Sequence, residues 1–276
     1  MTPNFDLSTG KYKVLQFPSG EVQVQLTKQP EALGDVLITG SILSSDHTME
    51  LLQLVEALRF EGVVFIDFLM PYCAYSRQDR RCNEGESFSL KIFAQLINSC
   101  DFRSVLTYDN HSDVATALID NCTNIPVKDI LYRRPEVNIR QYDYFVSPDA
   151  GANKKVFDCS KQFNISMIRA DKTRDVKTGN IIETLVFATA NELKNKTVLI
   201  IDDIGQGGRT FEELAKAMKA IEPSCIIHLY VTHGFFSHQF GISYMQSAGI
   251  SKFITTDSVY NRSSEIDQML TTVIKL

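Results

Sequence analysis

The segment NKTVLIIDDIGQGGRTFEELAKAMKAI, residues 195–221, decides the fold of this chain. It begins with a short apolar run typical of a buried β-strand, continues through two adjacent aspartates and a glycine-rich turn, and ends in an amphipathic helical pattern. Thr210 and Glu213 have the spacing of a capping box, in which Thr210 would be the N-cap. The segment therefore predicts a strand, a turn, and a helix whose N-terminus faces the turn.

Short apolar runs alternate with helical patterns along the rest of the chain. Strands are expected at 21–26 (half-exposed, in a hairpin), 35–40, 63–69, 104–109, 142–147, 165–170, 197–202, 225–233 and 252–257, and helices after Asp46 and from Ser87. This alternation is typical of α/β proteins with mainly parallel sheets. The polar stretch 123–141 is the best boundary, so we expect two α/β domains, residues 1–130 and 131–276.

Composition narrows the class of protein. The chain has 276 residues, 44% hydrophobic content and a net charge of −5, which argues against a nucleic-acid-binding surface. Its apolar runs are too short to span a bilayer and its start lacks the pattern of a secretory signal, so we expect a cytoplasmic protein without membrane contact. The six cysteines form no CxxC pair and have no histidine at ligand spacing, which predicts free thiols.

Polar residues follow several of the expected strands. Asp109 and His111 come after one strand, Asp149 after another, and the Asp202–Asp203 pair after a third. Ligands of parallel α/β sheets bind at the carboxyl ends of the strands. Adjacent carboxylates are costly unless they are neutralised or hydrogen-bonded, and a vicinal diol or a magnesium-bound ligand does both.

The turn after the two aspartates has the chemistry of an anion cradle. Its glycines, Gly205, Gly207 and Gly208, allow backbone N–H groups to point inward. The N-terminus of the following helix attracts phosphate through its free N–H groups and its dipole. Carboxylates for sugar hydroxyls beside a cradle for phosphate predict a ribose-phosphate site.

The segment VLIIDDIGQGGRT (198–210) resembles the binding loop shared by phosphoribosyltransferases and ribose-phosphate diphosphokinases. Further segments resemble the diphosphokinases alone, in the same order along the chain: PYCAYSRQDRR (71–81), YDNHSD (108–113), SPDAGANKK (147–155) and THGFFS (232–237). The resemblance implies two phosphoribosyltransferase-like, Rossmann-like domains. It also implies Mg²⁺-dependent transfer of the β,γ-diphosphate of ATP to the anomeric hydroxyl of a ribose 5-phosphate moiety, with release of AMP.

The same resemblance implies roles for individual residues. ATP would be held by Arg77, Gln78 and Asp79, and by Phe17, Ser19 and Glu21, which would reach the nucleotide of a neighbouring subunit in a homo-oligomer. Mg²⁺ would be bound by His111 and Asp149, and Lys172 and Arg174 would be the catalytic cations of a mobile loop that includes the glycine of KTGN. The ribose and its phosphate would be bound by Asp202, Asp203, Gln206, Gly207, Gly208, Arg209 and Thr210.

The loop departs from the family pattern where the acceptor is chosen. Gln206, Gly207 and Arg209 stand where the family has aspartate, threonine and glycine. An added guanidinium and a lost side chain suit a larger 5′-phosphate substituent, so ADP-ribose, as used in NAD salvage, is slightly favoured over ribose 5-phosphate. The short stretch before FPSGE predicts that the family's first strand and helix are missing, which leaves open whether the oligomer is a dimer or larger. A non-catalytic regulatory member of the family and a phosphoribosyltransferase remain as alternatives.

Overall fold

The computed structural model describes residues 4–7, 11–27, 34–174, 181–236, 242–259 and 271–276. The chain forms two compact units, Met1–Ile125 and Pro126–Leu276. The boundary predicted near residue 130 would fall within helix α4 (Val127–Tyr132), whereas the two units meet just before that helix begins.

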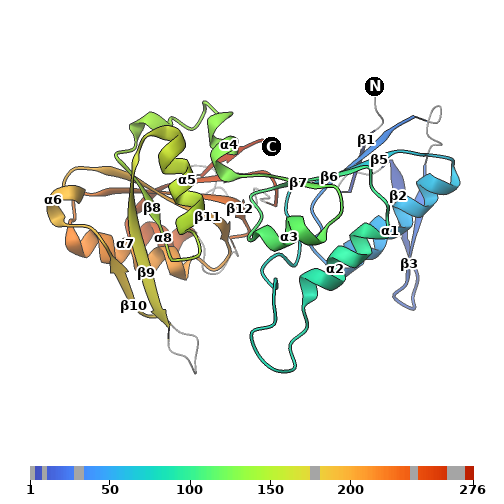
Figure 1. Cartoon of the computed structure of the whole chain (residues 1–276), viewed down its shortest axis with the longest axis horizontal. Helices are drawn as coiled ribbons and strands as arrows, with labels where there is room; N and C mark the ends of the chain where they lie inside the picture. The colour runs from blue at the N-terminus through green and yellow to red at the C-terminus, as the bar shows by residue number, and fades with distance from the viewer. Residues whose placement is uncertain (1–3, 8–10, 28–33, 175–180, 237–241, 260–270) are drawn as a thin grey trace. The chain divides into compact units, whose positions relative to one another are not determined.

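Unit 1, Met1–Ile125, contains a five-stranded sheet in the order β1-β4-β5-β6-β7, and every neighbouring pair is parallel (Figure 1). Its strands are β1 (Asn4–Asp6), β4 (Val36–Thr39), β5 (Ile66–Met70), β6 (Ser104–Tyr108) and β7 (Cys122–Ile125). Its helices are α1 (Ser45–Phe60), α2 (Ser89–Asn98) and α3 (Asp113–Leu118). The presence of β1 corrects the expectation that a first strand is missing. With three residues, β1 is too short to show a periodic pattern.

A separate antiparallel hairpin, β2 (Tyr12–Gln16) and β3 (Val22–Leu26), lies in unit 1 and confirms the hairpin predicted there. Gln53 of α1 fixes it: its side-chain amide donates to the Val22 carbonyl at 2.9 Å and accepts from the Val24 N–H at 2.9 Å. Helix α1 is capped by Ser44, whose side chain accepts from the N–H of His47, and not by Asp46, which lies within the first turn.

Unit 2, Pro126–Leu276, contains a seven-stranded sheet in the order β10-β9-β8-β11-β12-β13-β14, parallel except for the β9–β10 pair. Its strands are β8 (Tyr144–Ser147), β9 (Ser166–Arg174), β10 (Ile181–Val186), β11 (Thr197–Gly205), β12 (Ile226–Gly234), β13 (Ile250–Thr256) and β14 (Thr271–Ile274). Its helices, besides α4, are α5 (Asn153–Phe163), α6 (Ala190–Leu193), α7 (Arg209–Ile221) and α8 (Ile242–Ser247), with a 3₁₀ turn η1 (Ile139–Gln141).

The central strand β11 shows why this sheet is covered on both faces. Successive side chains of a strand point to opposite faces. Val198 and Ile200 belong to a core cluster that includes residues of α7 and α8, whereas Leu199 and Ile201 belong to a cluster that includes residues of α4 and α5. All four side chains are fully buried. A run of apolar residues without alternation is therefore what a strand between two helical layers requires, and the predicted α/β fold class is confirmed.

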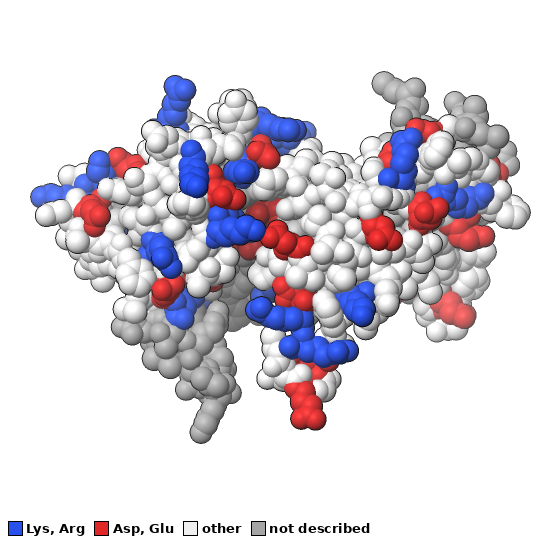
Figure 2. All heavy atoms as spheres, viewed as in Figure 1, with Lys and Arg blue, Asp and Glu red and all other residues white. Residues whose placement is uncertain are grey.

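Charges of both signs are intermixed over the face shown in Figure 2, without a large basic area. The six cysteines are free thiols. Within the described ranges, none of the helices combines the length and the apolar character needed to cross a bilayer.

Candidate functional site

In unit 2 the predicted site residues gather at the carboxyl ends of three neighbouring strands. Strand β8 lies between β9 and β11 and is parallel to both. Asp149 follows β8, Lys172 lies near the end of β9, and Asp202 and Asp203 lie near the end of β11. The aspartate pair lies inside the strand and not after it, because the pairing of β11 with β12 continues as far as Gly205. Asp149, Asp202 and Asp203, expected at strand ends, thus lie at one end of this sheet together with Lys172, whereas Asp109 and His111 follow β6 of the five-stranded sheet.

Asp149 and Lys172 form an ion pair. The Nζ of Lys172 lies 3.0 Å from Oδ2 of Asp149, and the lysine side chain is only 4% exposed. The other oxygen, Oδ1, accepts a hydrogen bond from the N–H of Ala152 at 3.2 Å. Burial alone would raise the pKa of Asp149, but the Lys172 ammonium and the N–H groups of Ala152 and Gly151 together lower it below the ordinary aspartate value. Asp149 is therefore an ionised carboxylate.

The Asp202–Asp203 pair has a less favourable environment. Asp203 is almost fully buried and Asp202 is partly exposed. Desolvation raises the pKa of Asp202 well above the ordinary value, and the charge of Asp203 adds to the rise, whereas the charge of Lys155 opposes it. Lys155 of α5 forms an ion pair with Asp203, with Nζ 3.5 Å from Oδ1. A ligand that donates hydrogen bonds to these oxygens would therefore be bound where the protein leaves negative charge poorly solvated.

The glycine-rich turn leads directly into α7. Gly208 is the N-cap, with φ of 72° in the left-handed region that favours glycine, and no side chain caps the helix. Thr210, expected to be the N-cap, is the second residue of the helix, because Gly208 takes the N-cap position and the helix begins at Arg209. A Cβ built on Gly207 would meet no atom within 4 Å, so the turn borders open space. Gln206 and Arg209 are exposed.

Helix α7 has 13 residues and an uncapped N-terminus beside this open turn. The free N–H groups of its first turn and its dipole are suited to an anion. The structure thus brings the predicted diol ligands and the predicted phosphate cradle next to each other, on one strand and the turn that follows it.

The end of β12 lies beside this turn, since Ile204 is paired with His233. His233 is buried, and its Nδ1 lies 2.8 Å from Oγ of Ser258. The hydroxyl of Ser258 also donates to the carbonyl of Thr232 at 3.2 Å. His233 is thus part of a buried hydrogen-bond network at the strand end. Ser237, the last residue of the matched THGFFS segment, lies outside the described residues.

In unit 1 two of the predicted segments follow neighbouring parallel strands. The segment 71–81 follows β5 and His111 follows β6, and the N–H of Tyr108 donates to the carbonyl of Pro71 at 3.3 Å. Asp109 has φ of 41°, a left-handed conformation that is rare for residues other than glycine. At this turn Asp109 and Asn110 are buried, whereas His111 is exposed.

The residues predicted to hold ATP lie in two places within unit 1. Arg77 and Gln78 are exposed on the stretch between β5 and α2, where the carbonyl of Gln78 accepts from the N–H of Leu90 at 3.3 Å. Asp79 of the same stretch lies 3.8 Å from the guanidinium of Arg80. The other three, Phe17, Ser19 and Glu21, form the tip of the hairpin; Ser19 donates to Glu21 at 2.7 Å, and Phe17 is 45% exposed.

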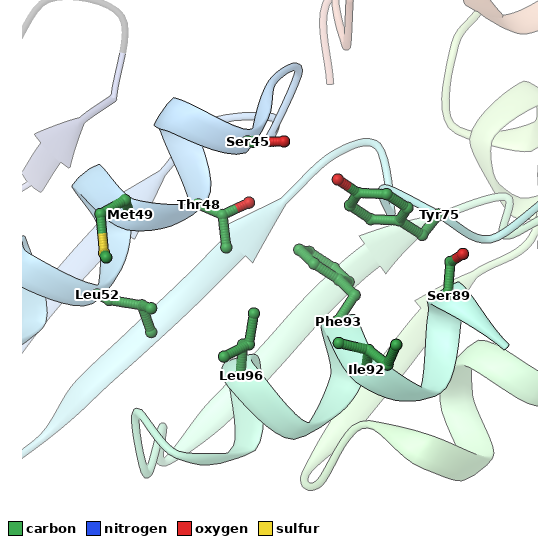
Figure 3. A pocket seen from close by; sticks show the side chains of 9 residues that line it. All are labelled: Ser45, Thr48, Met49, Leu52, Tyr75, Ser89, Ile92, Phe93 and Leu96. Atoms are coloured by element: carbon green, nitrogen blue, oxygen red, sulfur yellow. The ribbon is translucent and has the colours of Figure 1, made fainter. Parts of the chain in front are cut away.

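An apolar pocket of about 400 Å³ lies beside the segment 71–81. In Figure 3, residues of α1 and α2 face each other across it, with the ring of Tyr75 above Phe93. It is lined by Ser45, Thr48, Met49, Leu52, Tyr75, Ser89, Ile92, Phe93 and Leu96. None of these side chains is charged, so this pocket lacks the cations that phosphate groups require and is not a triphosphate site.

Several predicted site features fall where side chains are not described. The backbone of Arg174 belongs to β9, but its side chain lies outside the described residues, as does the loop 175–180 with the glycine of KTGN. Among the described residues, no three His, Cys, Asp or Glu side chains form a metal-binding cluster.

Two contacts at the candidate site could not be predicted from the sequence: the Lys172–Asp149 and Lys155–Asp203 ion pairs. A signal for the second was present. The first turn of α5 carries two lysines and no acidic residue, against the preference of helix N-termini for negative charge.

Comparison with known proteins agrees with this geometry. Residues 2–100 match the model of the N-terminal domain of ribose phosphate pyrophosphokinase, and residues 137–235 match that of the phosphoribosyl transferase domain. The chain is 30% identical over 258 residues to the ribose-phosphate pyrophosphokinase of Rhizobium meliloti, covering 92% of this chain and 81% of the relative. It is 29% identical over 265 residues to that of Chromobacterium violaceum, covering 93% and 77%.

Among solved structures, phosphoribosylpyrophosphate synthetase from Mycobacterium smegmatis has the same fold, with a TM-score of 0.79 at 20% identity over 96% of this chain and 85% of that one. With two matching domain models in the family order and relatives aligned along nearly its whole length, the chain belongs to the ribose-phosphate pyrophosphokinase family of diphosphotransferase enzymes.

Proposed function

We propose that the enzyme transfers the β,γ-diphosphate of ATP as one group to the anomeric hydroxyl of ribose 5-phosphate. The observation that carries the proposal is the carboxylate pair at the end of β11, followed at once by a glycine turn and the uncapped N-terminus of α7. In this arrangement Asp202 and Asp203 accept hydrogen bonds from the two ring hydroxyls. The 5-phosphate binds at the turn, to backbone N–H groups, Thr210 and Arg209.

Transfer of the diphosphate requires placement of the reacting groups and neutralisation of phosphate charge, and it requires little covalent catalysis. The anomeric oxygen attacks the β-phosphorus, the bond from that phosphorus to the α,β-bridging oxygen breaks, and AMP leaves with the bridging oxygen, while the hydroxyl proton is released. Lys172 and Arg174 are proposed to neutralise charge on the transferred group. Lys172 is held at the carboxyl end of the sheet by Asp149, with its Nζ 3.0 Å from Oδ2.

We also propose that the transfer requires Mg²⁺. The donor set fits this ion: Asp149 is an ionised carboxylate, and Oδ1 of Asn153, four residues later at the start of α5, is buried without a hydrogen-bond partner among the described residues. Mg²⁺ prefers oxygen ligands and is commonly held by one or two carboxylates together with substrate phosphates, so a complete protein cluster is not needed. Asp149 of unit 2 and His111 of unit 1 are each proposed as Mg²⁺ ligands, and the ion when bound would neutralise phosphate charge. The roles of Arg77, Gln78 and Asp79 in holding ATP, and of Phe17, Ser19 and Glu21 across a homo-oligomer interface, are proposed with it.

Two molecules are candidates for the acceptor, ribose 5-phosphate and ADP-ribose. The names of the relatives point to ribose 5-phosphate, and the slight preference for ADP-ribose drawn from the loop finds no support among them. One observation keeps ADP-ribose as the second candidate: the open space at Gly207 and the exposed Arg209 leave room and charge for a second phosphate. A cytoplasmic location stays a prediction.

The assay is AMP release from ATP with Mg²⁺ and, in separate reactions, ribose 5-phosphate, ADP-ribose or no acceptor. With ribose 5-phosphate we expect AMP and an equal amount of product carrying both the β- and γ-phosphorus, which ³¹P NMR detects. Faster turnover with ADP-ribose would replace the first candidate by the second. No AMP with either acceptor, together with tight ATP binding, would favour a non-catalytic regulatory member. Transfer of a ribose 5-phosphate group from its diphosphate to a base would favour a phosphoribosyltransferase.

A substitution tests the catalytic lysine. Lys172→Ala should abolish transfer and leave ATP binding nearly intact, because Lys172 acts on the transferred group. The matched control is Lys196→Ala, which removes a lysine paired with Asp143 at 2.9 Å on the surface of the same unit. Full activity of Lys172→Ala would show that the catalytic role proposed for Lys172 is wrong.

A further inference from the structure

Helix α5 begins with a charge pattern that local helix energetics disfavours. Lys154 and Lys155 lie in its first turn, where the helix dipole repels cations, and no acidic residue balances them there. The Lys155 side chain is also only 17% exposed, so its ammonium has lost much of its hydration. A cation with these costs needs a compensating charge from another element of unit 2.

The compensation comes from the carboxylate pair of β11. Nζ of Lys155 lies 3.5 Å from Oδ1 of Asp203, whose own side chain is 8% exposed. A hydrogen bond within the pair orients it further: Oδ1 of Asp202 accepts from the N–H of Asp203 at 3.0 Å. Two adjacent carboxylates with little solvent repel each other, and a buried cation at this distance offsets that repulsion.

Lys155 differs from Lys172 in what it can do during a reaction. Lys172 belongs to β9, near the end of a strand that leads toward the predicted catalytic loop, and pairs with Asp149. Lys155 is anchored in the first turn of an 11-residue helix, whose Val156 and Cys159 are fully buried. Its cation is therefore held in place by the core of unit 2 and acts as a fixed support.

We infer that Lys155 is a positioning residue for the acceptor sugar: it holds Asp203 and thereby orients the Asp202–Asp203 pair, so that both carboxylates accept hydrogen bonds from a vicinal diol. This inference rests on the proposed function and adds a residue to it. Lys155 touches neither the sugar nor the transferred phosphate. Its removal therefore affects binding of the acceptor and leaves the chemical step and ATP binding unaltered.

The test is steady-state kinetics of AMP release for the wild type and three variants, with ribose 5-phosphate and ATP varied in turn. Lys155→Met removes the charge and keeps much of the side-chain volume. Lys155→Arg keeps the charge. Lys161→Met removes one positive charge from the last turn of the same helix, where Lys161 is exposed above the Phe157 ring. Circular dichroism melting shows whether each variant folds.

We expect Lys155→Met to raise the KM for ribose 5-phosphate on the order of tenfold, with kcat and the KM for ATP within about twofold of the wild type. Lys155→Arg should restore most of the loss, and Lys161→Met should behave as the wild type.

An unchanged acceptor KM in Lys155→Met, a loss confined to kcat, or an equal effect of Lys161→Met would each overturn the inference. If Lys155→Met fails to fold, Lys155→Arg and Lys155→Gln decide by the same comparison. An inactive wild type would instead contradict the proposed function, so the two failures are distinguishable.

Discussion

Gly205 closes the strand that carries the aspartate pair, and replacing it by alanine should displace the end of that strand. A Cβ at this position would lie 2.7 Å from Cε1 of Phe236 and 3.1 Å from Cγ2 of Val231. Ordinary contacts begin at 3.4 Å, so the new methyl group overlaps a ring that is packed against the core of unit 2.

The ring cannot move away freely. The carbonyl of Gly205 accepts from the N–H groups of Phe235 at 2.8 Å and Phe236 at 3.2 Å, which ties the two segments together. The Phe236 ring also approaches the Phe253 ring, with centroids 6.5 Å apart. Overpacking of a well-packed core costs about 1–3 kcal/mol, and we expect Gly205→Ala to lose that much of the free energy of unfolding. Because Asp202 and Asp203 lie three and two residues earlier, the KM for the acceptor should also rise.

Urea unfolding followed by circular dichroism measures the loss. Gly207→Ala is the matched control: it adds the same methyl group two residues later, where it meets no atom, and should change stability by no more than about 0.5 kcal/mol. Gly205→Ala with Phe236→Leu should recover part of the stability, with a coupling of about 0.5–3 kcal/mol. Equal stability of the two alanine variants, or strict additivity in the double variant, would refute the overlap as the cause.

Three further predictions follow from particular contacts. Asp202→Asn should stabilise the enzyme at neutral pH by about 1–3 kcal/mol and abolish use of the acceptor. The pKa of Asp202 is raised in the folded state, so ionising this carboxyl group destabilises the folded enzyme, and asparagine removes that cost. The gain in the free energy of unfolding should be full above the folded-state pKa and should vanish as the pH falls toward the unfolded pKa of about 4. A gain that grows on acidification would contradict this. Gln53→Leu removes both hydrogen bonds from α1 to β3 and should cost about 1–3 kcal/mol in thermal unfolding, while Gln95→Leu, at an exposed position of α2, should cost little. In the native protein iodoacetamide should modify Cys82 first, because Cys82 is exposed, and mass spectrometry maps the modified residue. Burial raises the pKa of Cys73 to about 12 and the pKa values of Cys100 and Cys225 to about 11, which slows their reaction. Early labelling of Cys73 would argue against its burial.

The features that could be predicted from sequence are those written in consecutive residues. The apolar run of β11 has no alternation because both faces of the strand are buried, and the β3 run alternates because one face is exposed, so each pattern indicated its own environment. The position of the aspartate pair at a strand end before a glycine turn is equally local. For this reason the parallel α/β class and the clustering of acidic residues at one sheet edge could be expected from the order of residues alone.

Features that depend on distant neighbours could not be predicted in this way. Strands β1, β7 and β14 have three or four residues each, and only pairing with a longer neighbour makes them strands. The start of α7 differs from the predicted one because Gly208, in a left-handed conformation, is the N-cap and the helix begins at Arg209, one residue before Thr210.

The electrostatics of the site was decided by the tertiary structure alone. The sequence by itself determined that two carboxylates stand side by side, but not which cations meet them. Lys155 reaches Asp203 from a helix and Lys172 reaches Asp149 from an adjacent strand, because the parallel order β9-β8-β11 brings their ends together. Charges interact through space and burial, and both of these exist only once the chain is packed.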